Sequence, residues 1–182
     1  KILDHSYHSC FSRISNIKIK VKMLSTNNFK ELSFLVYGLG LTGQSVVHFF
    51  KNKNIKNFQV WDDYNKNLYK NNRSKNLKKS LQKVDYIILS PGISLKKLNN
   101  KELFKYKKKI ITDIDLIFLK KNNFKTIVVT GTNGKSTTCK IIELMLKKLK
   151  FKVSLGGNIG TPVLNLNINK IDFLIIEASS FQ

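Results

Sequence analysis

Residues 130–137 decide the fold, and they read Thr130-Gly131-Thr132-Asn133-Gly134-Lys135-Ser136-Thr137. The apolar run 126–129 leads into this stretch, and a helical pattern over 139–146 leads out of it. A strand, a glycine loop ending in Gly-Lys-Ser and a helix are typical of a P-loop, whose amides and helix N-terminus face nucleotide phosphates. In that pattern Lys135 reaches the outer phosphates and the hydroxyl of Ser136 can ligate Mg²⁺. The general pattern has glycine where this chain has Val129, so the loop is a variant.

A further apolar strand is expected at 171–176, and Glu177 stands at its end. In P-loop enzymes an acid in that position holds the metal that bridges the phosphates. The alternative is a carboxylate that simply faces solvent. We favour the metal ligand, because a carboxylate that ends so apolar a strand needs a partner and Mg²⁺ prefers oxygen ligands. A short strand at 151–154 and a glycine loop at 156–160 precede this strand.

A second glycine pattern occupies residues 38–43 and reads Gly38-Leu39-Gly40-Leu41-Thr42-Gly43. It separates an expected strand at 33–37 from an expected helix at 44–51. The first glycine makes the turn, the second lets a ligand approach the backbone, and the third lets helix pack on strand. Asp62 ends a strand about 20 residues later, where a Rossmann domain places the acid that binds a ribose hydroxyl. By itself this pattern predicts the NAD-binding domain of an oxidoreductase.

The segments between the two glycine motifs complete an α/β pattern. A buried strand at 84–89 ends in the turn 90–93, Ser90-Pro91-Gly92-Ile93, at the strand end where open α/β sheets bind ligands. Helices are expected at 98–108 and 113–119, with a strand at 109–112 between them. The polar, lysine-rich stretch 65–83 is expected to be a loop or a surface helix.

These elements predict an α/β fold with a Rossmann-like N-terminal domain, followed by the first part of a P-loop ATP-binding α/β domain. The expected boundaries are 1–22 for an extension outside the fold, 23–112 for the Rossmann-like domain and 113–182 for the ATP-binding domain. Met23 is a plausible start, because it stands about ten residues before the first strand, and the alternatives for residues 1–22 are a transit peptide or a genuine extension.

The formal net charge is +22, a value that raises the possibility of a nucleic-acid-binding protein. The charge comes almost wholly from lysines scattered beside asparagines and isoleucines, with Arg13 and Arg73 as the only arginines. No apolar run approaches the ~18 residues of a membrane helix. The two cysteines, Cys10 and Cys139, are far apart, which fits a reduced cytosolic setting, and Cys139 is expected to be a small core residue.

The loop 130–137 resembles the ATP loop of the Mur ligases and folylpolyglutamate synthetases, a family that lacks the first glycine and so accounts for Val129. The stretch 156–160 is similar to the family's second glycine loop. Within the family, the glycine loop 38–43, the turn 90–93 and the ending Glu177-Ala178-Ser179-Ser180-Phe181-Gln182 resemble the members that add D-glutamate to UDP-N-acetylmuramoyl-L-alanine. A folate ligase shares the P-loop, but a UDP-binding Rossmann domain ahead of it does not fit.

The resemblance implies an ATP-dependent amide-bond ligase of peptidoglycan synthesis, cytoplasmic and monomeric, without nucleic acid or membrane as partner. The substrate carboxylate would be phosphorylated to an acyl phosphate, and the amine of D-glutamate would displace phosphate. The resemblance also implies a bridging lysine, a histidine metal ligand and a C-terminal domain beyond Gln182. We therefore expect residues 1–182 alone not to catalyse the full reaction, and the uracil contacts to differ, because Asp63-Tyr64 stands where relatives have a hydroxyl and an arginine.

Site residues follow from the same resemblance. The ATP phosphates would be held by Gly131, Thr132, Asn133, Gly134, Lys135, Ser136 and Thr137. Lys135 and Glu177 would be catalytic, and Ser136 and Glu177 would hold Mg²⁺. The uridine-diphosphate site would be lined by Leu41, Thr42, Asp62, Asp63, Ser90 and Gly92. The muramoyl part would face Asn158, Ser179 and Gln182.

Overall fold

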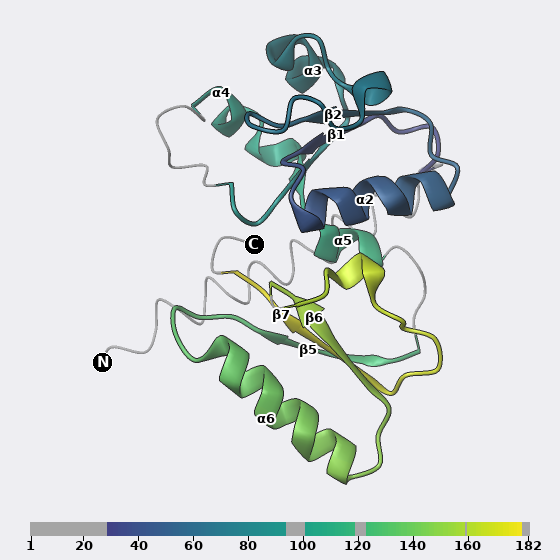
Figure 1. The fold of residues 1–182 in the computed structure, drawn as a ribbon, viewed down its shortest axis with the longest axis vertical. Helices are drawn as coiled ribbons and strands as arrows, with labels where there is room; N and C mark the ends of the chain where they lie inside the picture. The colour runs from purple at the N-terminus through teal and green to yellow at the C-terminus, as the bar shows by residue number, and fades with distance from the viewer. Residues whose placement is uncertain (1–28, 94–100, 119–122, 159, 180–182) are drawn as a thin grey trace.

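The computed structural model describes residues 29–93, 101–118, 123–158 and 160–179. Within them the strands form two parallel sheets, one ordered β2-β1-β3-β4 and the other β5-β7-β6. Figure 1 shows the two sheets one above the other, with α5 between them. The elements of the first unit are β1 (Phe34–Tyr37), α2 (Leu41–Asn52), β2 (Phe58–Trp61), η1 (Lys70–Asn72), α3 (Leu77–Lys83), β3 (Tyr86–Leu89), α4 (Lys101–Phe104), η3 (Lys107–Lys109) and β4 (Ile110–Ile111). They are followed by α5 (Asp113–Ile117), β5 (Lys125–Val129), α6 (Lys135–Lys148), β6 (Val153–Gly157), η4 (Val163–Asn165) and β7 (Phe173–Glu177).

Strand β1 is the centre of the first sheet, and all four of its residues are buried. Because successive side chains of a strand point to opposite faces, Phe34 and Val36 pack with α2 while Leu35 and Tyr37 pack with the cluster that contains Leu81 of α3. Both faces of the sheet are thus covered by helices (Figure 1), which is the layering of a Rossmann-like domain.

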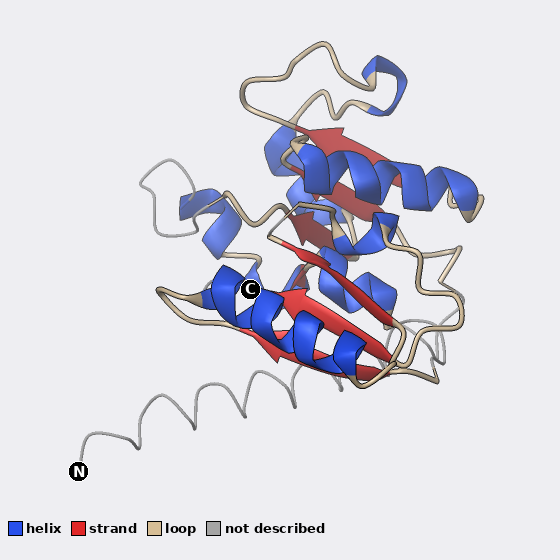
Figure 2. Cartoon of the chain, turned by 60° about the horizontal axis from the view of Figure 1, so that its bottom comes forward, coloured by secondary structure: helices blue, strands red, loops and turns tan. Residues whose placement is uncertain are grey.

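The second sheet is built around β7, which pairs with β5 on one side and β6 on the other. Its Leu174, Ile175 and Ile176 are fully buried, as the apolar run predicts. Helix α6 lies across one face of this sheet (Figure 2). Helix α5 and η4 cover the opposite face. The short α5 belongs to both cores, because its Leu116 packs in the α2 cluster while its Ile114 packs with β7.

The expected element order is confirmed, with differences at the ends. Helix α2 begins at Leu41 rather than Gln44, because the glycine loop turns directly into the helix. The prediction of a loop from Gly156 was wrong for its first two residues, because Gly156 and Gly157 end β6 in register with β7. The stretch 65–83 holds η1, α3 and an isolated parallel bridge between Val60 and Arg73.

The helix predicted at 98–108 is broken into α4 and η3, and its residues 98–100 lie outside the described residues. The helix predicted at 113–119 is described as far as Phe118 and ends at Ile117. Residues 1–22 also lie outside the described residues, so the extension and the domain boundary at 112/113 stay predictions. Among the described residues, every helix is too short or too polar to span a bilayer.

Candidate functional site

The glycine loop after β1 is tightly folded. Gly38 has a φ of +96°, and its amide donates to the carbonyl of Trp61 at 2.8 Å. A Cβ on Gly43 would lie 1.8 Å from the carbonyl oxygen of Gly38, so only glycine lets α2 start so close to β1. No described atom lies within 4 Å of a Cβ built on Gly40, which leaves room for a ligand. These positions match the roles that the sequence pattern predicts.

Asp62 holds this loop together. Its carboxylate is buried and accepts hydrogen bonds from the amides of Leu39, Tyr64 and Asn65. Burial opposes ionisation of Asp62, but the amides of Asn65, Leu39 and Tyr64 outweigh it and lower the pKa of this carboxyl. Both of its oxygens are therefore engaged by the chain itself, and ribose binding by Asp62 stays a prediction.

Asp63 is oriented by two aromatic side chains. Its carboxylate accepts from the indole Nε1 of Trp61 and from the hydroxyl of Tyr37, both at 2.9 Å. Burial, followed by this hydrogen bond to Asp63, raises the pKa of Tyr37. Ser90 also serves the loop, because its hydroxyl donates to the carbonyl of Gly38 at 2.9 Å. The acidic and hydroxyl groups near the first glycine loop thus fix its shape.

A cavity of about 590 Å³ opens between the two sheets. It is lined by Gly38, Gly40, Leu41, Thr42, Asp62, Asp63, Tyr64, Ser90, Pro91, Gly92, Ile93, Gly157, Asn158, Gly160 and Pro162. Every residue predicted for the uridine-diphosphate site is there, together with Asn158. Two of its large side chains are unusually exposed, Leu41 at 73% and Tyr64 at 93%. Ser179 is not among the lining residues, and Gln182 lies outside the described residues.

The segment after β6 reaches this cavity because it is tied to the end of β7. The amide of Asn158 donates to the carbonyl of Glu177, and that of Gly157 donates to Thr161, each at 3.0 Å. Gly157 has a φ of +118°, and a Cβ there would lie 2.3 Å from the carbonyl oxygen of Glu177. Glycine is therefore required where β6 passes the end of β7.

The P-loop at 130–137, called the second glycine loop from here on, presents side chains rather than only backbone amides. Gly134 adopts the left-handed conformation at the start of α6, with a φ of +73°. The ammonium of Lys135 donates to the carbonyls of Gly131 at 2.8 Å and Thr132 at 3.3 Å. The hydroxyl of Ser136 donates to Oε2 of Glu177 at 2.9 Å. Among the described residues, none of 130–137 lines the cavity.

Ser136 and Glu177 fit a magnesium ion, since a hydroxyl and a carboxylate are hard oxygen ligands. Glu177 is 5% exposed, so its carboxylate requires a partner, and Ser136 is one. Within the described ranges, no group of three or more histidine, cysteine, aspartate or glutamate residues gathers as a metal cluster. Mg²⁺ held by one carboxylate, a hydroxyl, water and phosphate does not need such a cluster.

Comparisons with known proteins agree with this geometry. Residues 32–112 match the family "Mur ligase MurD-like, N-terminal domain", and residues 129–182 match "Mur ligase middle domain". The chain belongs to the Mur ligase family. The predicted family and the α/β fold are thereby confirmed, and the two matches cover the two glycine loops in the expected order.

Relatives of the chain among Mur ligases are named UDP-N-acetylmuramoylalanine--D-glutamate ligase. One from Francisella tularensis subsp. tularensis (strain WY96-3418) is 39% identical over 158 residues, which is 86% of this chain and 36% of the relative. Another, from Francisella tularensis subsp. novicida (strain U112), has the same identity and coverage. The chain thus spans about a third of the length of these relatives. A solved pseudomurein peptide ligase type C from Methanothermus fervidus is 22% identical with a TM-score of 0.39, covering 82% of this chain and 33% of that one.

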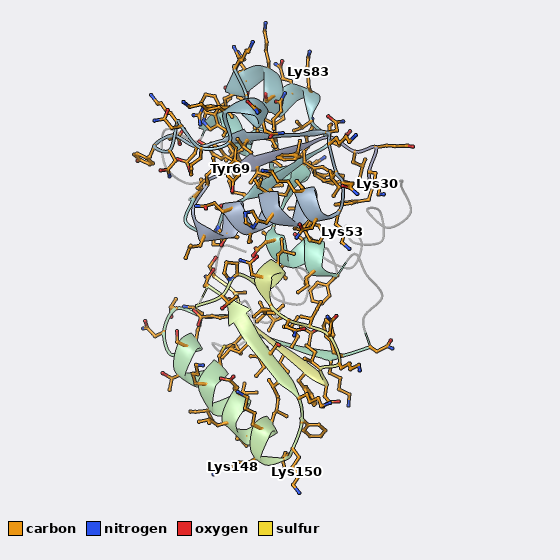
Figure 3. All side chains as sticks on the ribbon, turned by 45° about the vertical axis from the view of Figure 1, so that its right-hand side comes forward. Lys30, Lys53, Tyr69, Lys83, Lys148 and Lys150 are labelled. Carbon is orange, nitrogen blue, oxygen red and sulfur yellow. The ribbon has the colours of Figure 1, made fainter. Side chains whose placement is uncertain are left out.

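Neither alternative from the sequence, an NAD-binding oxidoreductase or a nucleic-acid-binding protein, is supported. An NAD-binding oxidoreductase leaves the Ser136–Glu177 contact unexplained. A nucleic-acid-binding protein would need basic residues gathered on one surface. Figure 3 instead shows Lys83 at one end of the described structure and Lys148 with Lys150 at the other.

Proposed function

We propose that the protein is a cytoplasmic, monomeric ligase of peptidoglycan synthesis that uses ATP and Mg²⁺ to join D-glutamate to UDP-N-acetylmuramoyl-L-alanine. The observation that carries the proposal is the double role of Glu177. Its carboxylate accepts from Ser136 in the P-loop, and its carbonyl accepts from Asn158, which lines the cavity. One strand end therefore links a phosphate-binding loop to a substrate cavity, as phosphoryl transfer between two bound substrates requires.

The P-loop residues would bind and neutralise the phosphates. The ammonium of Lys135 donates to the carbonyls of Gly131 and Thr132, within the loop itself. Phosphate oxygens would replace these carbonyls, because a charged acceptor forms a stronger hydrogen bond with an ammonium group. Gly131 through Thr137 supply the backbone amides of the loop and the start of α6, whose positive dipole end favours anions. ATP with Mg²⁺ would supply the activation of the substrate carboxylate, and Lys135 would stabilise the transferring charge.

The first glycine loop would hold the diphosphate of the sugar nucleotide. Helix α2 begins at Leu41 beside the cavity and has no acidic residue in its first turn, so nothing in that turn repels an anion from its amides. Gly40 leaves the backbone open to a phosphate. The exposed side chains of Leu41 and Tyr64 offer apolar surface that a nucleoside base would cover. Asn158, on the opposite wall, would face the muramoyl part together with Ser179 and Gln182.

A binding experiment separates this proposal from the oxidoreductase alternative. Trp61 is the single tryptophan of the chain, and its indole donates to Asp63 on the cavity wall. Titration with UDP should change its fluorescence with saturation, and titration with NADH should not. Saturable NADH binding without UDP binding would overturn the proposal.

An activity assay tests the reaction itself. The full-length protein should release ADP from ATP only when both UDP-N-acetylmuramoyl-L-alanine and D-glutamate are present. Lys135→Ala should reduce turnover about 100-fold or more, because one preorganised charge at the transferring group is removed. Lys148→Ala, at the far end of the same helix, should leave turnover unchanged. ADP release that does not depend on D-glutamate would contradict the proposal.

A further inference from the structure

Arg73 is the one arginine among the described residues, and it contacts the loop 62–65, of which Asp62, Asp63 and Tyr64 line the cavity. Its guanidinium donates to the carbonyl of Asp62 at 2.9 Å and to the carbonyl of Asn65 at 3.1 Å. The same group stacks over the ring of Trp61, 5.4 Å from its centroid. A single side chain thus contacts two carbonyls of the loop and the last residue of β2.

The loop needs this support because it leaves an edge strand. Strand β2 is an edge strand of the first sheet. Among the described residues, β1 is the one strand that pairs with it, so its outer side has no neighbouring strand. An isolated bridge between Val60 and Arg73 stands on that outer side, reinforced by the amide of Ser74, which donates to Val60 at 3.0 Å. This bridge sets the backbone of Arg73 so that its side chain reaches the loop.

The face of the loop opposite to Arg73 belongs to the cavity. Asp63 and Tyr64 both line it, and Asp63 is fixed by Trp61 and Tyr37. The side chain of Tyr64 is 93% exposed, so the path of its backbone, rather than packing of its ring, decides where the ring lies. Its amide donates to Asp62, the residue whose carbonyl Arg73 holds.

We propose that Arg73 is a positioning residue for the nucleobase end of the cavity, acting through the backbone of residues 62–65 on the ring of Tyr64. A nucleoside base stacked on Tyr64 is the ligand that this arrangement fits, since aromatic rings stack on every base. The inference rests on the proposed sugar-nucleotide substrate. In this arrangement Arg73 does not contact the ligand, and the diphosphate is bound by the first glycine loop.

Arg73→Gln tests the proposal in the full-length protein by titration calorimetry with UDP and, separately, inorganic pyrophosphate. Loss of base stacking should weaken UDP binding about tenfold. Binding of pyrophosphate and of ATP should stay within about twofold, since neither depends on Tyr64. Lys70→Gln removes a neighbouring positive charge whose ammonium has no hydrogen bond or ion pair with loop 62–65 among the described residues, and it should leave UDP binding unchanged. Equal weakening by both variants would overturn the proposal in favour of general electrostatic attraction.

A double variant distinguishes positioning from mere stability. Tyr64→Ala alters an exposed side chain and should weaken UDP binding about as much as Arg73→Gln, about tenfold. If Arg73 acts through Tyr64, the double variant should bind no more weakly than either single one. Additive losses overturn the proposal. Arg73→Lys, which keeps the charge but lacks the planar pair of donors, should restore little of the affinity.

These arms separate the two levels of inference. If the wild type binds UDP and both Arg73→Gln and Arg73→Lys bind it as tightly as the wild type does, the role of Arg73 is overturned and the proposed function stays intact. Absence of UDP binding by the wild type overturns the proposed function together with this inference. If Arg73→Gln fails to fold, Arg73→Lys and Tyr64→Ala carry the same comparison. In the ligase assay, a raised KM for the sugar nucleotide with unchanged kcat supports the role of Arg73.

Discussion

The two glycine loops of this protein share one local design and use it differently. Each joins a parallel strand to the N-terminus of a helix, β1 to α2 and β5 to α6. Around the first loop, the carboxylate of Asp62 and the hydroxyl of Ser90 bond to the chain's own backbone. At the second, Lys135 donates to the carbonyl of Gly131 and Ser136 donates to the carboxylate of Glu177, and we propose that both side chains turn to ATP phosphates and Mg²⁺. The first loop offers a rigid backbone surface, and the second offers side chains that can exchange partners.

The helices that follow the two loops, α2 and α6, also differ in how much of their surface is buried. Helix α2 buries Val46, Val47 and Phe50 in a core of interlocked rings, whereas in α6, whose residues are all described, Cys139 alone is buried. Several apolar residues of the second unit are instead exposed, among them Ile141, Leu144, Met145 and Leu149. The helix behind the first loop is thus anchored in a core, whereas the helix behind the P-loop leaves much of its apolar surface exposed among the described residues.

Replacing the third glycine of the first loop should have the largest effect. Gly43→Ala would place a methyl group 1.8 Å from the carbonyl oxygen of Gly38, a backbone atom that cannot move aside. We expect the free energy of unfolding to fall by about 3 kcal/mol, the upper range for overpacking, with loss of UDP binding. Denaturant titration measures the first effect and calorimetry the second.

Gly40→Ala is the matched control in the same loop. No described atom lies within 4 Å of the added Cβ, so stability should stay within about 0.5 kcal/mol of wild type. UDP should nevertheless bind more weakly, because the methyl group would occupy the space where a phosphate approaches the backbone. Equal stability of the Gly43 and Gly40 variants would contradict the packing argument.

The features that the sequence predicts correctly are those that depend on residues close together in the chain or on burial of a whole strand. The glycine spacings of 38–43 and 131–134 reflect contacts within one turn of chain, and so they predict the local structure well. Glu177 was recognisable because a carboxylate ending a buried strand must meet a partner, and Ser136 is that partner. Apolar runs located the buried strands, since burial on both faces of a parallel sheet removes polar residues.

Contacts between distant segments were beyond such patterns. Nothing local indicates that both oxygens of Asp62 are taken by amides, or that Tyr64 stands exposed at a cavity. The assignment of Gly156 and Gly157 to a loop failed because glycine usually breaks strands, whereas here it lets β6 pass close to β7. The support of the loop by Arg73 depends on a single bridge to Val60, which leaves no periodic signal.

Removing the charge of Glu177 should have the next largest effect, confined to the second loop. Glu177→Gln keeps an oxygen for the hydroxyl of Ser136 but loses the negative charge that a metal prefers. The concentration of Mg²⁺ needed for half-maximal ATP binding should rise about 10–100-fold, as for loss of a group that tunes a metal site. UDP binding at the first loop should not change.

Glu143→Gln is the control for this variant, since Glu143 lies on α6 and pairs with Lys140 and Lys147 at its surface. It should leave the magnesium requirement as in the wild type. A similar shift in both variants would show that the overall charge of the unit, rather than Glu177, sets the metal requirement.

A pH-dependent effect on stability, rather than on ligand binding, is expected where α5 joins the two units. Burial, with a contribution from Asp115, raises the pKa of Asp113 to about 6 from 3.8. The folded state then holds this proton more tightly than the unfolded state, so the stabilisation is complete below pH ~4 and is lost as pH rises through ~6. Asp113→Asn should gain up to about 3 kcal/mol relative to wild type between pH 4 and 7.5. A stability difference that is constant over this range in denaturant titrations would refute the role of Asp113.

Gly134→Ala should give the smallest change and completes the comparison of the loops. Gly134 has a φ of +73°, and no described atom lies within 4 Å of an added Cβ, so the penalty is backbone strain without a clash. The left-handed conformation costs an alanine about 1 kcal/mol, well below the cost expected at Gly43. Gly160→Ala, with a φ of +65° and equally open space, should cost the same stability but leave ATP binding unchanged. If Gly134→Ala cost as much as Gly43→Ala, the P-loop would be as tightly packed as the first loop, and the contrast in packing between the two loops would be wrong.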